Sequence, residues 1–94
     1  MKITDVKEYA VVFTYNFDQQ SEIYLFGSDL AGAQKFLKDS FENELAIETE
    51  ENEWEDVESW HNDDWTWASI THYVGTDHDD CEYRICTNVR RVEE

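Results

Sequence analysis

The chain has 94 residues, 40% of them hydrophobic, and its formal net charge is −16, from 23 acidic and 7 basic side chains. Four Trp, five Tyr and five Phe make it too aromatic for a disordered acidic tail. The chain holds no run of about 18 apolar residues that could cross a membrane, and its start lacks the apolar stretch of a secretory signal. We therefore expect a single folded domain, residues 1–94, in the cytoplasm.

The first part of the chain predicts a β-hairpin. In residues 6–15 the side chains alternate as they do along a strand. Residues 16–21 are polar and typical of a turn, and residues 22–26, with the sequence EIYLF, predict the second strand.

A helix is predicted next. It begins after Gly27, because Ser28 or Asp29 can cap the free N–H groups of a helix start. Apolar side chains then recur at helical spacing, at Leu30, Ala33, Leu37, Phe41 and Leu45.

The second half of the chain is less uniform. Residues 46–62 suit a helix, a loop or a short strand, whereas residues 65–74 and 81–89 predict two strands around a turn at 75–80. The resulting order ββαββ predicts an α+β fold, with a four-stranded antiparallel sheet and one helix packed on one face.

One helix covers only one face of such a sheet, and the predicted third strand also carries aromatic side chains on its other side, namely Trp65, Trp67 and Tyr73. Monomers rarely expose large apolar patches. Either residues 46–62 fold over this second face, using Ile47, Trp54, Val57 and Trp60, or a partner or a second copy docks there.

The negative charge is concentrated in the middle of the chain. No Lys or Arg lies between Lys38 and Arg84, and residues 39–83 contain sixteen of the carboxylates. Phosphates repel such a surface, so direct contact with nucleic acid or an anionic membrane is disfavoured. The predicted partner is a basic protein surface.

Within this block, Glu44, Glu48, Glu51, Glu55 and Glu58 are spaced by four, three, four and three residues, which would place them on one face of a helix. A helix over residues 44–58 would carry its acids at about one per 2.6 Å, close to the one charge per about 1.7 Å of duplex DNA. The alternative is a solvated, partly disordered acidic loop.

An acidic array of this kind could occupy the groove of a nucleic-acid-binding protein, with Trp side chains as apolar anchors. The predicted partner-binding residues are Glu44, Glu48, Glu51, Glu55, Asp56, Glu58, Asp63, Asp64, Trp54, Trp60 and Trp65.

No catalytic, metal or cofactor site is predicted. The acidic cluster between Asp77 and Glu82 lacks the spacing of a calcium loop and is read as a hairpin turn. The chain has no nucleophile motif, no glycine-rich phosphate loop and no HExxH motif. Cys81 and Cys86, five residues apart on one strand, should be separated by roughly 16 Å and point to opposite faces, so we expect free thiols.

Several segments resemble small acidic proteins of Gram-positive bacteria, their phages and mobile elements, a family with no settled activity. These segments are YAVVFTYNFD, EIYLFGSDLAGAQKFLKDSFENEL, IETEEN, WASITHY and EYRI. A mobile-element origin implies an antagonist of host defence, of the anti-CRISPR or antirestriction type.

The sequence therefore predicts an acidic, non-enzymatic binding protein that acts as a nucleic-acid mimic and inhibits a basic nucleic-acid-binding protein, such as a nuclease. The alternative is a structural or regulatory interaction module that uses its aromatic sheet face, with homodimer formation through that face as one form of it.

Overall fold

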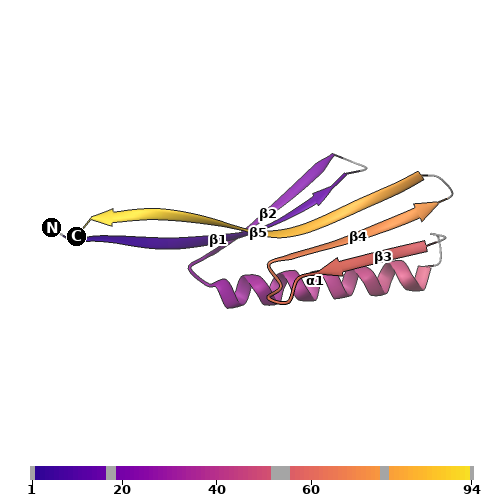
Figure 1. The fold of residues 1–94 in the computed structure, drawn as a ribbon, viewed down its shortest axis with the longest axis horizontal. Helices are drawn as coiled ribbons and strands as arrows, with labels where there is room; N and C mark the ends of the chain where they lie inside the picture. The colour runs from indigo at the N-terminus through magenta and orange to yellow at the C-terminus, as the bar shows by residue number, and fades with distance from the viewer. Residues whose placement is uncertain (1, 17–18, 52–55, 75–76, 94) are drawn as a thin grey trace.

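The computed structural model describes residues 2–16, 19–51, 56–74 and 77–93. In these residues, one antiparallel sheet has the strand order β2-β1-β5-β4-β3, and one helix lies along one face of it (Figure 1). The α+β class, with one helix on an antiparallel sheet, is confirmed. The elements are β1 (Ile3–Tyr15), β2 (Gln20–Gly27), α1 (Leu30–Glu51), β3 (Asp56–His61), β4 (Trp67–Val74) and β5 (Asp77–Glu93).

The sheet has five strands, so the prediction of four strands is wrong. The additional strand is β3, which lies within the segment that the sequence left open. Val57 lies opposite His72 of β4, and Trp60 lies opposite Ser69. A short segment of mixed composition becomes a strand when a neighbouring strand supplies its hydrogen bonds and packing, which local sequence does not report.

Of the two alternatives for the second sheet face, cover by residues 46–62 is wrong for the described part of that segment. Residues 46–51 continue α1, and residues 56–61 form the edge strand β3 within the sheet itself. Ile47 therefore belongs to the helix, and Val57 and Trp60 belong to the sheet. Trp54 lies outside the described residues.

The strand β5 is longer at both ends than the predicted 81–89. At its start, Asp77 pairs with Val74 of β4, so residues 77–80 belong to the strand and not to a turn. At its end, pairing with β1 continues to Glu93, which lies opposite Ile3. At both ends, pairing with a neighbouring strand extends β5 into residues that are too polar to be predicted as a strand from the sequence.

The core lies between α1 and the facing side of the sheet. Ala33, Leu37 and Phe41 of the predicted helical stripe are buried, and they pack in one cluster with buried sheet residues. Aromatic rings fill the centre: Phe13 stacks on Phe36 at 5.6 Å between centroids, and the ring of Tyr83 meets the ring of Phe13 edge-on at 4.7 Å. The buried sheet residues of the cluster are Val11, Phe13, Ala68, Ile70, Cys81 and Tyr83.

The start of α1 is capped by Asp29. Its backbone carbonyl accepts the first helical hydrogen bond, from the N–H of Ala33 at 3.1 Å. Its carboxylate accepts a second one, from the N–H of Gly32 at 2.9 Å. This geometry confirms the predicted helix start and satisfies a donor that the helix itself leaves free.

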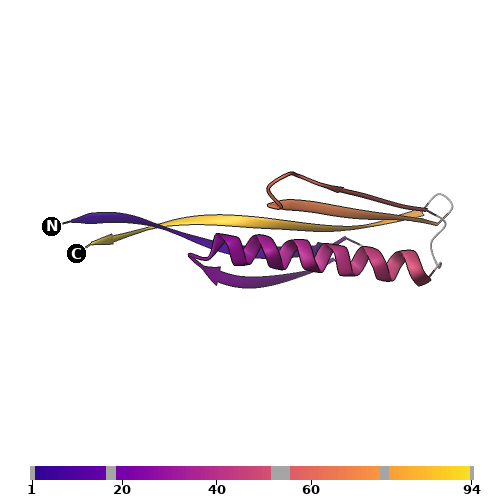
Figure 2. The same cartoon turned by 90° about the horizontal axis from the view of Figure 1, so that it is seen from below.

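β1 and β5 extend beyond the other strands as a two-stranded ribbon, which we define as residues 3–8 and 88–93. β2 pairs with β1 only from Tyr9 onward, and β4 pairs with β5 only as far as Arg84. Figures 1 and 2 show the ribbon leaving the layers of sheet and helix, with both chain ends at its tip. The molecule is consequently elongated, with extents of 61 × 22 × 17 Å.

Candidate interaction surface

The sheet face opposite α1 has no described element over it, and we call it the open face. Side chains alternate along each strand, so the neighbours of the buried core residues point away from the helix. Val12 and Arg84, for example, are neighbours of buried Val11 and Tyr83. The aromatic second face predicted from the sequence therefore exists, and the described part of the chain leaves it uncovered.

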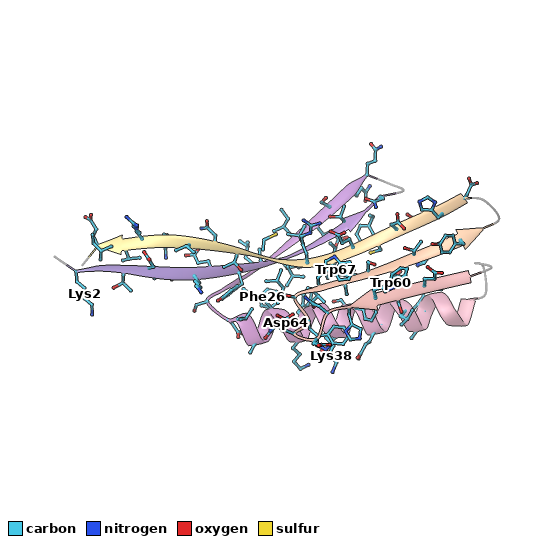
Figure 3. All side chains as sticks on the ribbon, in the orientation of Figure 1. Lys2, Phe26, Lys38, Trp60, Asp64 and Trp67 are labelled. Atoms are coloured by element: carbon cyan, nitrogen blue, oxygen red, sulfur yellow. The ribbon has the colours of Figure 1, made fainter. Side chains whose placement is uncertain are left out.

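An apolar belt crosses this open face. Ile23 of β2 lies opposite Val12 of β1, and the row continues through Arg84 of β5 to Trp67 of β4. Figure 3 labels Trp67 at the start of β4 and Trp60 on the neighbouring β3. The belt consists of Val12, Ile23, Leu25, Trp60 and Trp67, of which Leu25 is 83% exposed, Ile23 65%, Trp60 48% and Trp67 36%.

Ile23 and Leu25 were not among the predicted partner-binding residues. Their signal is the unbroken apolar run IYLF at residues 23–26, in which Tyr24 and Phe26 contact Phe36 of the helix. A strand that is apolar on both faces buries only one of them against a single layer. In β2, Tyr24 and Phe26 point towards α1, whereas Ile23 and Leu25 point to the open face.

Carboxylates accompany the belt. The register places Glu58 of β3, Asp80 of β5 and Glu82 of β5 on the same face as Trp60 and Trp67. The hydroxyl of Tyr73 donates a hydrogen bond of 3.4 Å to Glu58, and Glu82 forms an ion pair with Arg84. The open face thus combines exposed apolar side chains with negative charge.

A shallow pocket of about 460 Å³ adjoins the belt where the ribbon leaves the sheet. Leu25, Ala10 and Cys86 form part of its wall on the open face, and Glu8 and Asn88 line it on the ribbon side. The pocket therefore lies between the belt and the ribbon.

The structure separates the predicted partner-binding residues. The helix ends at Glu51, so the predicted acidic row over 44–58 does not form one helical face. Glu48 and Glu51 lie on α1 and Asp56 on β3, and the side chains of these three are not described. Glu55 and Trp54 lie outside the described residues. Glu58 and Trp60 are on β3, on the open face.

Glu44 is half-buried on α1, at the border of the core. Burial raises the pKa of Tyr15 to about 12 and the pKa of Cys81 to about 11, and the negative charge of Glu44 contributes to both shifts. The carboxylate of Glu44 therefore acts on the face of the sheet that packs against α1. Glu58 and Trp60 lie on the opposite face, so Glu44 is separated from them.

Asp63 and Asp64 lie in the connection between β3 and β4. Asp64 builds this connection: its carboxylate accepts a hydrogen bond from the Thr66 hydroxyl at 2.7 Å, and its carbonyl accepts one from the Gln34 side chain at 2.8 Å. Both aspartates are exposed at the rim of the sheet. They can add negative charge beside the open face without belonging to the belt.

Trp65 points to the helix side, so its predicted place on the aromatic second face is wrong. Its backbone is left-handed, with φ of 57°, and its indole lies 5.6 Å from the ring of Phe41. The ammonium of Lys38 lies 5.5 Å from the indole centroid (Figure 3 labels Lys38). The turn in the chain at this residue reverses the alternation that a strand over 65–74 would have given.

Among the described residues, Cys81 and Tyr83 are buried titratable groups that carry no activation as nucleophiles. Burial raises the pKa of the Cys81 thiol and of the Tyr83 hydroxyl, and a raised pKa keeps both groups in their unreactive neutral form. Cys86 is exposed, and both cysteines are free thiols, as predicted.

The acidic cluster from Asp77 to Glu82 lies on β5, where alternation divides it between the two sheet faces. The imidazole Nε2 of His78 lies 3.7 Å from a carboxylate oxygen of Asp80. Among the described residues, no three His, Cys, Asp or Glu side chains are arranged to hold a metal ion.

No helix in the described part of the chain combines the length and apolar composition that a bilayer crossing needs. Comparison with protein-family models, with curated proteins and with solved structures found no match to this chain in any of the three.

Proposed function

We propose that this chain is a non-enzymatic acidic binding protein that docks on a basic protein surface through its open face. The observation that carries the proposal is the uncovered apolar belt, in which Leu25 and Ile23 are 83% and 65% exposed. Single exposed apolar residues are common, but several exposed apolar residues gathered on one face are typical of a docking surface. Within this belt, Arg84 lies between Val12 and Trp67.

The charge of the chain selects the chemistry of the partner. The net charge is −16, and Glu58, Asp80 and Glu82 lie beside the belt. A complementary surface has an apolar centre that receives Trp60 and Trp67, surrounded by Lys and Arg side chains. Electrostatic attraction would speed the encounter, and the apolar anchors would hold the complex.

Proteins that bind nucleic acid carry basic surfaces of this kind. We therefore propose a nuclease or another nucleic-acid-binding protein as the partner and inhibition as the outcome. This version rests on the overall density of negative charge, since the carboxylates do not continue as one helical row beyond Glu51.

The proposal is tested by affinity purification from a Gram-positive bacterial lysate, followed by calorimetric titration of the purified partner. The wild-type chain is compared with a double variant, Leu25→Ser and Trp67→Ser, which removes apolar surface from the open face. Matched controls are Val89→Ser and Ile47→Ser, which remove apolar side chains that are 55% and 39% exposed elsewhere.

We expect the open-face variant to lose the partner and both controls to keep it. We also expect affinity to fall steeply with added salt, and we expect the chain to compete with DNA or RNA for the partner. Retention of the same partner by the open-face variant would disprove docking through the belt. If binding does not depend on salt and the chain does not compete with DNA or RNA for the partner, the proposal that it inhibits a nucleic-acid-binding protein would be disproved.

A further inference from the structure

The ribbon has two free edges. Within the described residues, the outer edge of β1 has no partner strand before Tyr9, and the outer edge of β5 has none after the contact of Ile85 with Thr66. The strands nonetheless stay paired with one another as far as Ile3 and Glu93. Free edges of this length present rows of backbone donors and acceptors to an incoming strand.

The ribbon buries little apolar surface of its own. A two-stranded ribbon is marginal in water, and three or more strands with an apolar face are the usual minimum. Here Val6 and Val92 are only half-buried, Ile3 is 56% exposed and Val89 is 55% exposed. The ribbon has the features of an element completed by additional strands.

Its charge sets it apart from the rest of the molecule. Residues 3–8 and 88–93 contain three acidic and three basic side chains, so the entire net charge of −16 lies outside the ribbon. The described residues of the acidic stretch, 39–51, 56–74 and 77–83, lie away from the ribbon in the other part of the elongated molecule (Figure 1). Electrostatic repulsion is screened over about 8–10 Å at physiological salt, so two copies repel each other least when their ribbons meet.

The sequence along the free edge of β1 is complementary to itself. In an antiparallel pair of β1 edges centred on Val6, each Asp5 lies opposite Lys7 of the second copy, and the two Val6 side chains face each other. Each Asp5 already lies 3.6 Å from Arg91 of its own chain, so it would sit between two cations. A centre one residue earlier would instead oppose the two Asp5 carboxylates.

The geometry points to a homodimer in which two copies of this chain pair antiparallel along the free β1 edges, over residues 4–8. The two ribbons become one four-stranded sheet, and Val6 and Val92 of both copies form a continuous apolar strip on one side of it. The two acidic bodies point away from each other. A dimer of this shape is about 100 Å long, because about five residues of overlap at roughly 3.4 Å each join two molecules of 61 Å. None of the five belt residues takes part in this contact.

Cysteine crosslinking tests the register. In a Cys86→Ser background, Val6→Cys should give a disulfide-linked dimer under mild oxidation, because residue 6 faces itself across the symmetry axis. Thr4→Cys alone and Glu8→Cys alone should remain uncrosslinked, whereas a mixture of the two should crosslink, since residue 4 lies opposite residue 8 of the second copy. Crosslinking through Val92→Cys instead of Val6→Cys would overturn the proposal, because it would place the interface on β5.

Charge exchange tests the contacts. By analytical ultracentrifugation, we expect Lys7→Glu to raise the dimer dissociation constant by about tenfold or more, because a carboxylate at position 7 would face Asp5 of the second copy. The double variant Asp5→Lys and Lys7→Glu should recover only part of the lost affinity, because the pair across the interface is again of opposite charge but the new lysine lies beside Arg91 of its own chain. Circular dichroism checks that each variant is folded. A wild-type chain that stays monomeric at millimolar concentration would disprove the dimer. Loss of the dimer in Lys7→Glu without loss of the basic partner would show that the two surfaces act independently.

Discussion

The imidazole of His61 and the indole of Trp65 stack face to face, with ring centroids 3.9 Å apart and an angle of 10° between their planes. His61 ends β3, and Trp65 lies in the connection to β4. Both rings also contact Phe41 of α1, at 5.9 Å and 5.6 Å between centroids. This cluster fastens the edge strand and its connection to the helix.

The left-handed backbone of Trp65 predicts that a glycine variant is at least as stable as an alanine variant at this position, the reverse of the usual order. We expect Trp65→Ala to lower the free energy of unfolding by about 2–3 kcal/mol through the lost aromatic contacts. Gly is normally about 0.5–1 kcal/mol worse than Ala, but at a φ of 57° it removes backbone strain of about 1–2 kcal/mol. Trp65→Gly should therefore be at least as stable as Trp65→Ala in urea unfolding.

Phe41 provides the matched control for this comparison, because it lies inside α1 with ordinary helical geometry. There, Phe41→Gly should be less stable than Phe41→Ala by about 1 kcal/mol. The same order at both positions would contradict a strained backbone at Trp65.

The helix start predicts coupling between Asp29 and Gly32. Asp29→Ala should lower the free energy of unfolding by about 1 kcal/mol, because the Gly32 N–H loses its acceptor. A Cβ at Gly32 would overlap the Asp29 carboxylate, so the gain of about 1 kcal/mol usual for Gly→Ala in a helix is offset there. Gly32→Ala should stabilise the Asp29→Ala variant more than the wild type, and additive effects in a double-mutant cycle would contradict this geometry.

His72 predicts a pH dependence of stability. Burial lowers its pKa from the usual 6.5, against the opposing charges of Asp79, Glu44 and Asp80. The unfolded chain therefore binds a proton at a higher pH than the folded chain does. The stabilising contribution of neutral His72 is complete above about pH 6.5 and is lost as pH falls from there towards the folded pKa.

This contribution is measured as the difference in unfolding free energy between the wild type and His72→Gln, followed from pH 7.5 down to pH 5. We expect the difference to shift against the wild type as pH falls. Parallel curves for the two proteins would show that His72 does not carry the effect.

The two cysteines should differ in reactivity. Cys81 is buried and its pKa is raised to about 11, mainly by that burial, whereas Cys86 is exposed. A thiol reagent at pH 8 should therefore modify one thiol in the native chain and both in denaturant. In Cys86→Ser, rapid native labelling should disappear, and rapid labelling of Cys81 would mean that the core opens more readily than its packing indicates.

Much of the candidate surface lay beyond sequence analysis because it depends on which strands are neighbours. The sequence predicts Trp60 as an anchor, and Trp60 reaches the open face only because β3 pairs with β4. It predicts the same role for Trp65, but the left-handed backbone at that residue directs its side chain to the helix. The apolar residues of EIYLF indicate a strand with apolar side chains on both faces. That Ile23 and Leu25 belong to an exposed surface is evident only from the structure, in which no described element covers them.

Local periodicity was enough to predict the first hairpin, the cap and apolar stripe of α1, and the strand character of residues 67–74, and the concentration of carboxylates between Lys38 and Arg84 is read directly from the residues. Long-range pairing was needed to show that residues 56–61 form a fifth strand, that β1 and β5 continue together as a ribbon, and that no described element covers one face of the sheet. A strand is completed by hydrogen bonds and side chains from a distant part of the chain, whereas a helix closes its hydrogen bonds within itself.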